Sequence, residues 1–219
     1  KSSKIDEILK ISKKYDLKVI SDTAQSPMAL YKKKFAGTLG DIGGISLNYH
    51  KHIHTGEGGG IFTNNKKYAE KMKMIRNHAE AVLRKRKNFS EINMIGNNFR
   101  MGELEAAISI VQLNKLKKII YKRIKIANYL TDKLSEIDGL VLPKKYNDNT
   151  NVYYTYPIVL EETKKFDRKK IIKLLKKEGL EGFGSGYQNL HLLPTFQKKI
   201  AYGKYHFPWK SSFNKRNIS

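Results

Sequence analysis

Apolar residues in the first third of the chain follow helical and strand spacing in turn. A helical spacing in residues 4–15 gives way to strand-like segments, after which a helical spacing returns. The predicted strands are 17–24, 40–48 and 58–65, and the second predicted helix is 66–80. Helices that alternate with strands favour an α/β fold for this part of the chain.

A long helical pattern dominates the middle of the chain. Residues 103–137 keep apolar positions near helical spacing without Pro or Gly, which predicts a helix with a break or bend inside it. Beyond Gly139 we predict a strand, a helix and a glycine-interrupted strand, typical of a smaller α+β domain. These predicted elements are 152–160, 167–180 and 180–187.

The net charge of the chain bears on whether it binds nucleic acid. Lys and Arg number 43 against 20 Asp and Glu, a net charge of +23. The excess is mostly lysine spread along the chain, whereas arginine, which makes bidentate contacts to phosphate and guanine, is scarce. The positive charge therefore fits a solvated basic surface better than a nucleic-acid-binding surface. A nucleic-acid-binding protein remains the alternative function. We expect no nucleic-acid partner.

Composition narrows the location and the chemistry further. No segment reaches the ~18 apolar residues of a membrane span, so we expect no membrane partner. The chain has no cysteine, which excludes disulfides, thiolate catalysis and cysteine metal sites, and we assign no metal site. No signal-like segment is recognisable, so we expect the protein to be cytoplasmic.

Three polar residues lie at or just after the ends of predicted strands. Asp22 lies where the first strand ends, Gln25 follows three residues later, and Lys51 follows the next strand, ahead of a glycine-rich turn. Functional groups of open α/β sheets gather at such strand ends, so these side chains suit a shared crevice. A lysine that binds an aldehyde and a carboxylate that keeps a pyridine nitrogen protonated are what pyridoxal phosphate requires. On spacing alone, a solvated lysine and a turn aspartate are the commoner outcome.

Four motifs make the pattern specific: VISDTAQS, GDIGGISLNYHKHIHTGEGGGIFTN, RNHAE and IGNNFRMGELEAAISIVQL, in this order. Together they resemble the DegT/DnrJ/StrS family of sugar aminotransferases, which are pyridoxal-phosphate enzymes of fold type I, like aspartate aminotransferase. The resemblance covers most of residues 15–135 and is weaker to about residue 209. It implies that residues 1–118 are the C-terminal part of the αβα pyridoxal-phosphate-binding domain and residues 119–219 an incomplete small α+β domain. The family's N-terminal phosphate loop and early strands have no counterpart here, so we expect an internal fragment.

The resemblance also implies roles for five residues. Lys51 takes the position of the lysine that forms the Schiff base with pyridoxal 5'-phosphate, and Asp22 that of the acid paired with the pyridine nitrogen. Gln25 matches the side chain against the cofactor near its 3-hydroxyl, and Ser46 the hydroxyl that binds its phosphate. Asn98 matches an asparagine that reaches the phosphate in the neighbouring subunit, which implies a homodimer with shared active sites.

The implied activity is transfer of an amino group, with glutamate as the donor, to a keto group of a nucleotide-linked deoxysugar in polysaccharide or glycan biosynthesis. Relatives with histidine in place of the lysine are sugar dehydratases of the same family, so dehydration is the alternative reaction. His50 and His52 flank Lys51, but counting five positions from Ser46 gives Lys51, which favours transamination.

Weaker candidates lie around these motifs. For each of them a turn, packing or solvated role competes with a role in the site, and Ala79 replaces the usual glycine of the third motif. They are Glu57, Arg76, His78, Tyr187, His191 and the basic run Arg84, Lys85, Arg86 and Lys87.

Overall fold

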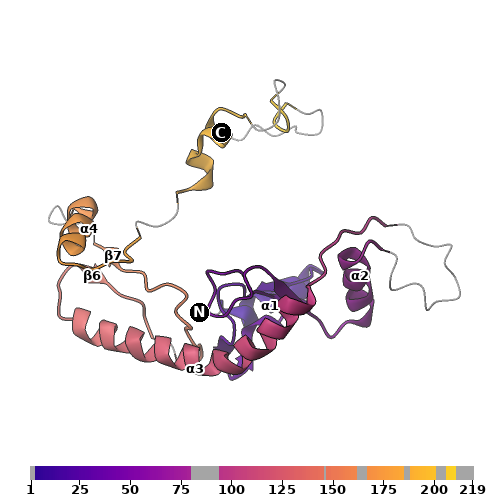
Figure 1. Ribbon diagram of the computed structural model, residues 1–219, viewed down its shortest axis with the longest axis horizontal. Helices are drawn as coiled ribbons and strands as arrows, with labels where there is room; N and C mark the ends of the chain where they lie inside the picture. Colours follow the sequence, from indigo (N-terminus) through magenta and orange to yellow (C-terminus); the bar gives the residue numbers. More distant parts are fainter. Residues whose placement is uncertain are drawn as a thin grey trace, which may run out of the picture. The chain divides into compact units, whose positions relative to one another are not determined.

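A computed structural model describes most of the chain (Figure 1). The described residues are 3–79, 94–145, 147–161, 167–184, 188–200 and 206–210. The chain divides into two compact units, Lys1–Thr163 and Lys164–Ser219. The domain boundary predicted between residues 118 and 119 falls inside helix α3 (Glu103–Leu134) and stays a prediction. No helix in these segments is both long enough and apolar enough to cross a membrane.

Helix α1 (Ile5–Lys14) confirms the helical spacing of the first residues. It buries Ile5 and Ser12. Acidic residues occupy its first turn and lysines its last, which suits the positive and negative ends of the helix dipole.

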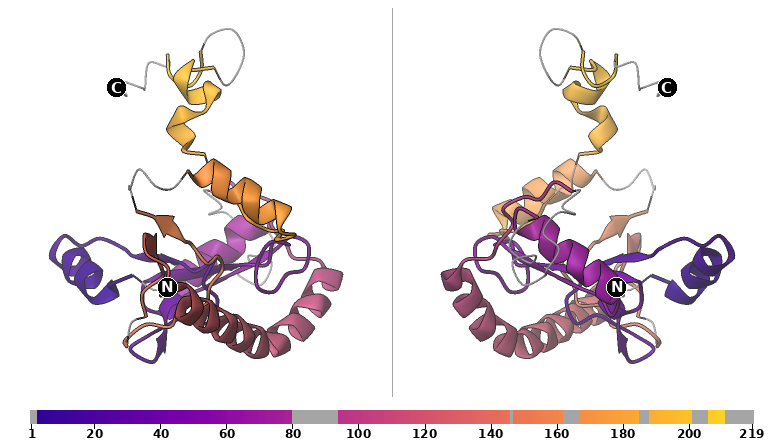
Figure 2. Two further views of the ribbon diagram at one scale, coloured as in Figure 1. Left: turned by 90° about the vertical axis from the view of Figure 1, so that its left-hand side faces the viewer. Right: turned by 90° about the vertical axis from the view of Figure 1, so that its right-hand side faces the viewer.

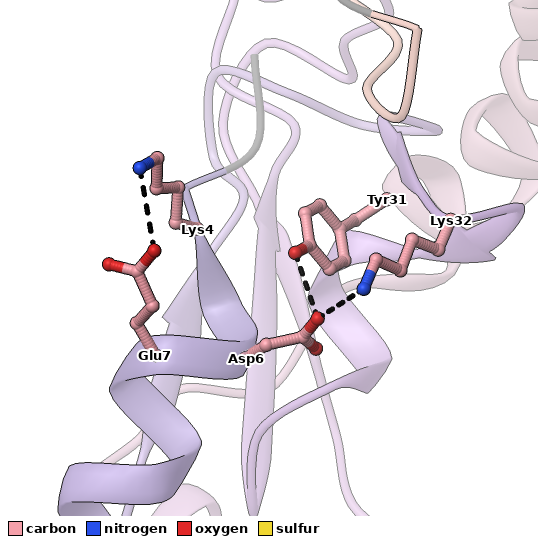
Figure 3. A network of polar contacts seen from close by, with 5 residues as sticks. All are labelled: Lys4, Asp6, Glu7, Tyr31 and Lys32. Atoms are coloured by element: carbon pink, nitrogen blue, oxygen red, sulfur yellow. Dashed lines mark hydrogen bonds and ion pairs between the residues drawn. The ribbon is translucent and has the colours of Figure 1, made fainter.

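A polar contact joins α1 to a short hairpin, β2 (Leu30–Tyr31) and β3 (Lys34–Phe35) (Figure 3). Asp6 Oδ2 accepts hydrogen bonds from the Tyr31 hydroxyl, at 3.0 Å, and from Lys32 Nζ, at 2.5 Å. The hydrogen bond from Lys32, followed by that from Tyr31, lowers the pKa of the Asp6 carboxyl below its usual value. An ionised Asp6 therefore favours this contact between α1 and the hairpin.

The hairpin lies between the first two predicted strands, where the sequence pattern predicts no strand. Its two turn residues, Lys32 and Lys33, both have positive φ, +46° and +65°. Two-residue hairpin turns of this kind favour Asn-Gly, and two lysines give no such signal. The absence of the usual turn residues explains why the pattern missed it.

A three-stranded sheet is formed by residues of the first two sequence motifs. Strand β1 (Ile20–Asp22) pairs in parallel with β4 (Ile42–Ser46), and β4 pairs antiparallel with β5 (Gly59–Phe62). All three confirm predicted strands. Asp22 is in register with Gly44, so the carboxyl ends of β1 and β4 lie at the same edge of the sheet.

Gly43 in β4 allows the short helix η1 (Ala36–Thr38) to lie against the sheet. A Cβ at Gly43 would collide with the backbone oxygen of Gly37 and with the ring of Phe62. Thr23 lies at the same junction, where its hydroxyl donates to Gly44 O.

Two helices follow the sheet. Helix α2 (Lys66–Arg76) begins at Asn65, whose side chain accepts from Tyr68 N, and it confirms the predicted helix. Helix α3 is unbroken over 32 residues and curves along its length (Figure 2), so the predicted bend takes the form of curvature.

The core of the first unit lies where the middle of α3 meets the loops around the sheet. Its buried residues are Ala29, Ala36, Leu47, Ile53, Leu116, Ile120 and Val152. The apolar residues nearer the start of α3, Leu104 and Ile108, are exposed. The start of α3 therefore presents apolar side chains that the described part of the chain leaves exposed.

The predicted strand 152–160 is wrong except at its end. Only Val159–Leu160 forms a strand, β7, which pairs antiparallel with β6 (Leu140–Val141). Tyr153 has φ +49°, which interrupts an extended backbone.

The second unit contains helix α4 (Arg168–Lys177), the short helix η4 (Leu190–Leu192) and α5 (Pro194–Gln197). The Asp167 side chain caps α4 by accepting from two backbone N–H groups, and Gly179 follows it with φ +79°, as the sequence predicts. Residues 180–184 form no strand, and residues 185–187 lie outside the described segments.

Candidate active site

Lys51 lies in the loop between β4 and β5, residues 47–58, here called the Lys51 loop. Backbone hydrogen bonds from Leu47 N to Gly58 O, at 2.9 Å, and from Thr55 N to Leu47 O, at 3.0 Å, close the loop at its base. Asn48 shapes its interior: Lys51 N donates to Asn48 O at 2.9 Å, and the Asn48 amide donates to Glu57 Oε1 at 2.7 Å. The loop is therefore a defined structure rather than a flexible connection.

The residues around Lys51 have different environments. His50 is exposed, Lys51 is half-buried, and His52 and Ile53 are buried, with exposed fractions of 6% and 1%. His52 Nε2 lies 2.9 Å from Val152 O, and because a carbonyl only accepts, Nε2 donates this hydrogen bond. Burial lowers the pKa of His52, which favours the neutral ring. Of these four residues, Lys51 alone lines the cavity described next.

A cavity of about 590 Å³ brings together three of the predicted residues, Asp22, Gln25 and Lys51. Asp22 Oδ1 accepts from Ala24 N at 2.9 Å, and neither its Oδ2 nor the Gln25 amide has a partner among the residues that the structure describes. These groups remain available to a ligand. The rest of the lining comes from Ala24, Ser26, Pro143, Lys144, Asn151, Val152, Tyr154, Thr155 and Pro157.

The other two predicted residues do not line this cavity. Ser46 ends β4, and its hydroxyl accepts from Asn48 N at 3.2 Å. Asn98 is exposed and forms a backbone bridge with Asn77. Arg100 Nη1 supports the same junction by donating to Asn77 Oδ1 at 2.6 Å. The roles expected for Ser46 and Asn98 stay predictions.

The weaker candidates near the sheet have structural contacts. Glu57 binds Asn48, and Arg76 ends α2, where its carbonyl accepts from Phe99 N. His78 and Ala79 both have positive φ, +54° and +61°, so the tight turn is present although Ala79 replaces glycine.

The remaining weak candidates lie elsewhere. His191 lies in η4 of the second unit, where its carbonyl accepts from Gln197 Nε2. Tyr187 and the basic run at residues 84–87 lie outside the described residues.

Sequence reasoning missed the segment 151–154, which lines the cavity beside Lys51. Lys51 Nζ lies over the Tyr154 ring, 4.9 Å from its centroid. The ring of His52 lies 5.9 Å from the same ring. The letters VYYTY predict a strand, and no local signal shows that Tyr154 lies against Lys51.

The donor set suits pyridoxal phosphate. The cavity volume lies within the ~300–1,000 Å³ typical of small-molecule sites. An amine, a carboxylate with a free oxygen and a side-chain amide face it, the groups needed for an aldehyde, a pyridine nitrogen and a ring hydroxyl. In the described part of the chain, no group of three or more His, Asp and Glu residues could hold a metal ion.

Among curated proteins, GDP-perosamine synthase of Caulobacter vibrioides is 30% identical over 193 residues, which is 88% of this chain and 51% of that protein. The chain spans about half the length of the curated relatives it matches, between 51% and 58% for the first three.

Solved structures agree with this likeness. Helicobacter pylori PseC, an aminotransferase of pseudaminic acid biosynthesis, superposes with a TM-score of 0.77 at 27% identity, over 90% of this chain and 52% of that one. Escherichia coli GDP-4-keto-6-deoxy-D-mannose-3-dehydratase with bound hydrated pyridoxal phosphate gives 0.72 at 28% identity, over 82% and 49%. The predicted fold, part of the fold-type-I transferase architecture, is confirmed.

The sequence profile of one family matches the chain along its whole length, residues 1–219. Together with the strand-end arrangement of Asp22, Gln25 and Lys51, this match fixes the family. The chain belongs to the DegT/DnrJ/EryC1/StrS aminotransferase family.

Proposed function

We propose that the protein uses pyridoxal 5'-phosphate to transfer an amino group from glutamate to a keto group of a nucleotide-linked deoxysugar. The observation that carries the proposal is the shared cavity of Lys51, Asp22 and Gln25. The names of relatives that make GDP-perosamine and pseudaminic acid support a sugar substrate. The product would serve polysaccharide or glycan biosynthesis, and we keep the cytoplasm as the expected location.

Lys51, Asp22 and Gln25 would have different roles in this reaction. When bound, pyridoxal phosphate supplies an aldehyde that takes up an amino group and a ring that accepts electrons. Lys51 would hold the cofactor through its amine and, when that amine is free and neutral, would serve as general base at the substrate carbon. Asp22 would hold the ring nitrogen in its protonated form, and Gln25 would contact the ring near its hydroxyl.

The proposal also includes a phosphate-binding site and a second subunit. Ser46 lies at the end of β4, five residues before Lys51, where its hydroxyl is available to bind phosphate. Asn98 is exposed, as a residue that reaches into a second copy must be. We therefore propose a homodimer in which each subunit contributes to its neighbour's phosphate site.

The environments around position 51 favour transamination over dehydration. Neither histidine could replace the lysine, since His50 is exposed and His52 is turned to Val152 O. The similarity to a 3-dehydratase keeps dehydration as the second candidate.

A borohydride experiment tests the proposal. Sodium borohydride makes the bond between a lysine amine and the cofactor aldehyde permanent, and mass spectrometry of the digested intact protein locates it. We expect the label on Lys51, its loss in Lys51→Arg, and no loss in Lys66→Arg, a matched exposed lysine in α2. A label on another side chain, or none, would refute the assignment.

The reaction is then assigned with a panel of keto-sugar nucleotides and ¹⁵N-glutamate. We expect ¹⁵N in the sugar product. A product that loses a hydroxyl and gains no nitrogen would assign the dehydratase reaction instead.

A further inference from the structure

The ring of Tyr154 faces the Lys51 amine. Lys51 Nζ lies 4.9 Å from the ring centroid, within the ~6 Å over which an ammonium ion is attracted to an aromatic face. Both residues line the cavity that contains Asp22 and Gln25. The ring is therefore placed to act on the amine in the position where the proposed reaction uses it.

Tyr154 is presented by a strained segment of backbone. Tyr153, the residue before it, has φ +49°, a left-handed conformation that is unfavourable for a bulky side chain, and it is 6% exposed. Strain of this kind persists where surrounding contacts over-determine the conformation, and it gathers at functional sites. The conformation of Tyr153 therefore points to a role for this segment in the site.

Three side chains fix this backbone. His52 Nε2 donates to Val152 O at 2.9 Å. Arg123 Nη1, from α3, donates to Tyr153 O at 3.0 Å, and Asn151 Oδ1 accepts from Tyr153 N at 3.1 Å. Because His52 follows Lys51 directly, the loop that presents the amine also holds the segment that presents the ring.

We propose that Tyr154 is a positioning residue for the Lys51 amine. Its ring face holds Nζ in the cavity while the amine is an ammonium ion, before it bonds to the cofactor, and His52 maintains this arrangement through Val152. The proposal rests on the function proposed above, because it assigns to that site a residue and a support that the sequence does not reveal.

The test measures how fast acetic anhydride acetylates Lys51 in the intact protein without cofactor, with peptide mass spectrometry as the readout. Only the neutral amine reacts, and the ring stabilises the ammonium form. At neutral pH we expect acetylation of Lys51 to be about two- to fivefold faster in Tyr154→Leu, and unchanged in Tyr154→Phe, which keeps the ring.

The pH profile separates this effect from simple access to the amine. At a pH well above the ordinary lysine value of ~10.4, where a lysine amine is mostly neutral with or without the ring, the ratio of rates should return towards one. A ratio that stays constant with pH would mean that the leucine only opens the cavity, and it would overturn the proposal. So would equal rates at neutral pH in the wild type and Tyr154→Leu.

Two further variants test specificity and coupling. Tyr49→Leu removes an exposed ring from the same loop, and we expect no change in the acetylation of Lys51. His52→Leu should speed acetylation in the wild type and add nothing in Tyr154→Leu, because it acts through the ring. An equal effect of His52→Leu in both backgrounds, or an increase in Tyr49→Leu, would contradict the proposal.

Failure of this inference is distinguishable from failure of the proposed function. If borohydride labels Lys51 but the acetylation rates do not respond to Tyr154, the function stands and the positioning role falls. If borohydride labels another residue, the proposed function is refuted whatever the acetylation rates are. The positioning role of Tyr154 is then refuted as well, because it assumes that Lys51 binds the cofactor.

Discussion

Gly43 and Gly44 are neighbours in β4, yet they should respond very differently to alanine. A Cβ at Gly43 would collide with Gly37 O, a backbone atom of η1 that cannot move alone, and with the ring of Phe62. A Cβ at Gly44 meets nothing closer than Gly60 O at 3.8 Å, an ordinary contact. Because both changes remove the same chain entropy from the unfolded state, the difference between them reports the collision.

The collision sets the size of the effect. Overpacking costs about 1–3 kcal/mol, and a clash with backbone belongs at the upper end, so we expect Gly43→Ala to be about 3 kcal/mol less stable than Gly44→Ala. In urea unfolding of the intact protein followed by circular dichroism, this is a midpoint lower by about 1 M if the slope is near 3 kcal/mol/M. Equal midpoints for the two variants would refute the close approach of η1 to the strand.

Three further predictions concern other contacts. Lys33→Gly relieves a positive φ of +65° in the β2–β3 turn and should raise stability by about 1 kcal/mol in thermal unfolding, whereas destabilisation would argue against that turn. Asp6 has a lowered pKa, so its stabilising contribution is present above the unfolded value of 3.8 and is lost as pH falls through the folded value; wild type and Asp6→Asn should converge in unfolding free energy at acid pH. The pKa of His52 is lowered from 6.5, so on acidification the unfolded state binds the proton first, and the free energy of unfolding falls as pH drops below 6.5. His52→Gln should therefore flatten the dependence of the unfolding free energy on pH between about pH 7.5 and 5. An unchanged slope would contradict the buried neutral ring.

The sequence pattern predicted those helices and strands whose positions depend on residues close together in the chain. The strands that become β1, β4 and β5 are marked by short apolar segments and turn residues, and Asp167 and Gly179 mark the ends of α4. The same patterns placed Asp22, Gln25 and Lys51 at one sheet edge, because parallel strands bring their carboxyl ends together.

Contacts between distant residues decided what the patterns missed. The segment VYYTY has strong strand propensity, but His52, 100 positions earlier, and Arg123 bind its carbonyls and hold Tyr153 at a positive φ. The β2–β3 hairpin depends on Asp6 at its side rather than on favourable turn residues. Propensity carries no information about either contact.

The bond between His52 and Val152 also has a consequence during synthesis. At ~5–20 residues per second, Val152 follows His52 from the ribosome after about 5–20 s. During that interval the nascent chain has its reactive amine but not the tyrosine ring that covers it. The site therefore cannot assemble until the segment that contains Tyr154 has been synthesised.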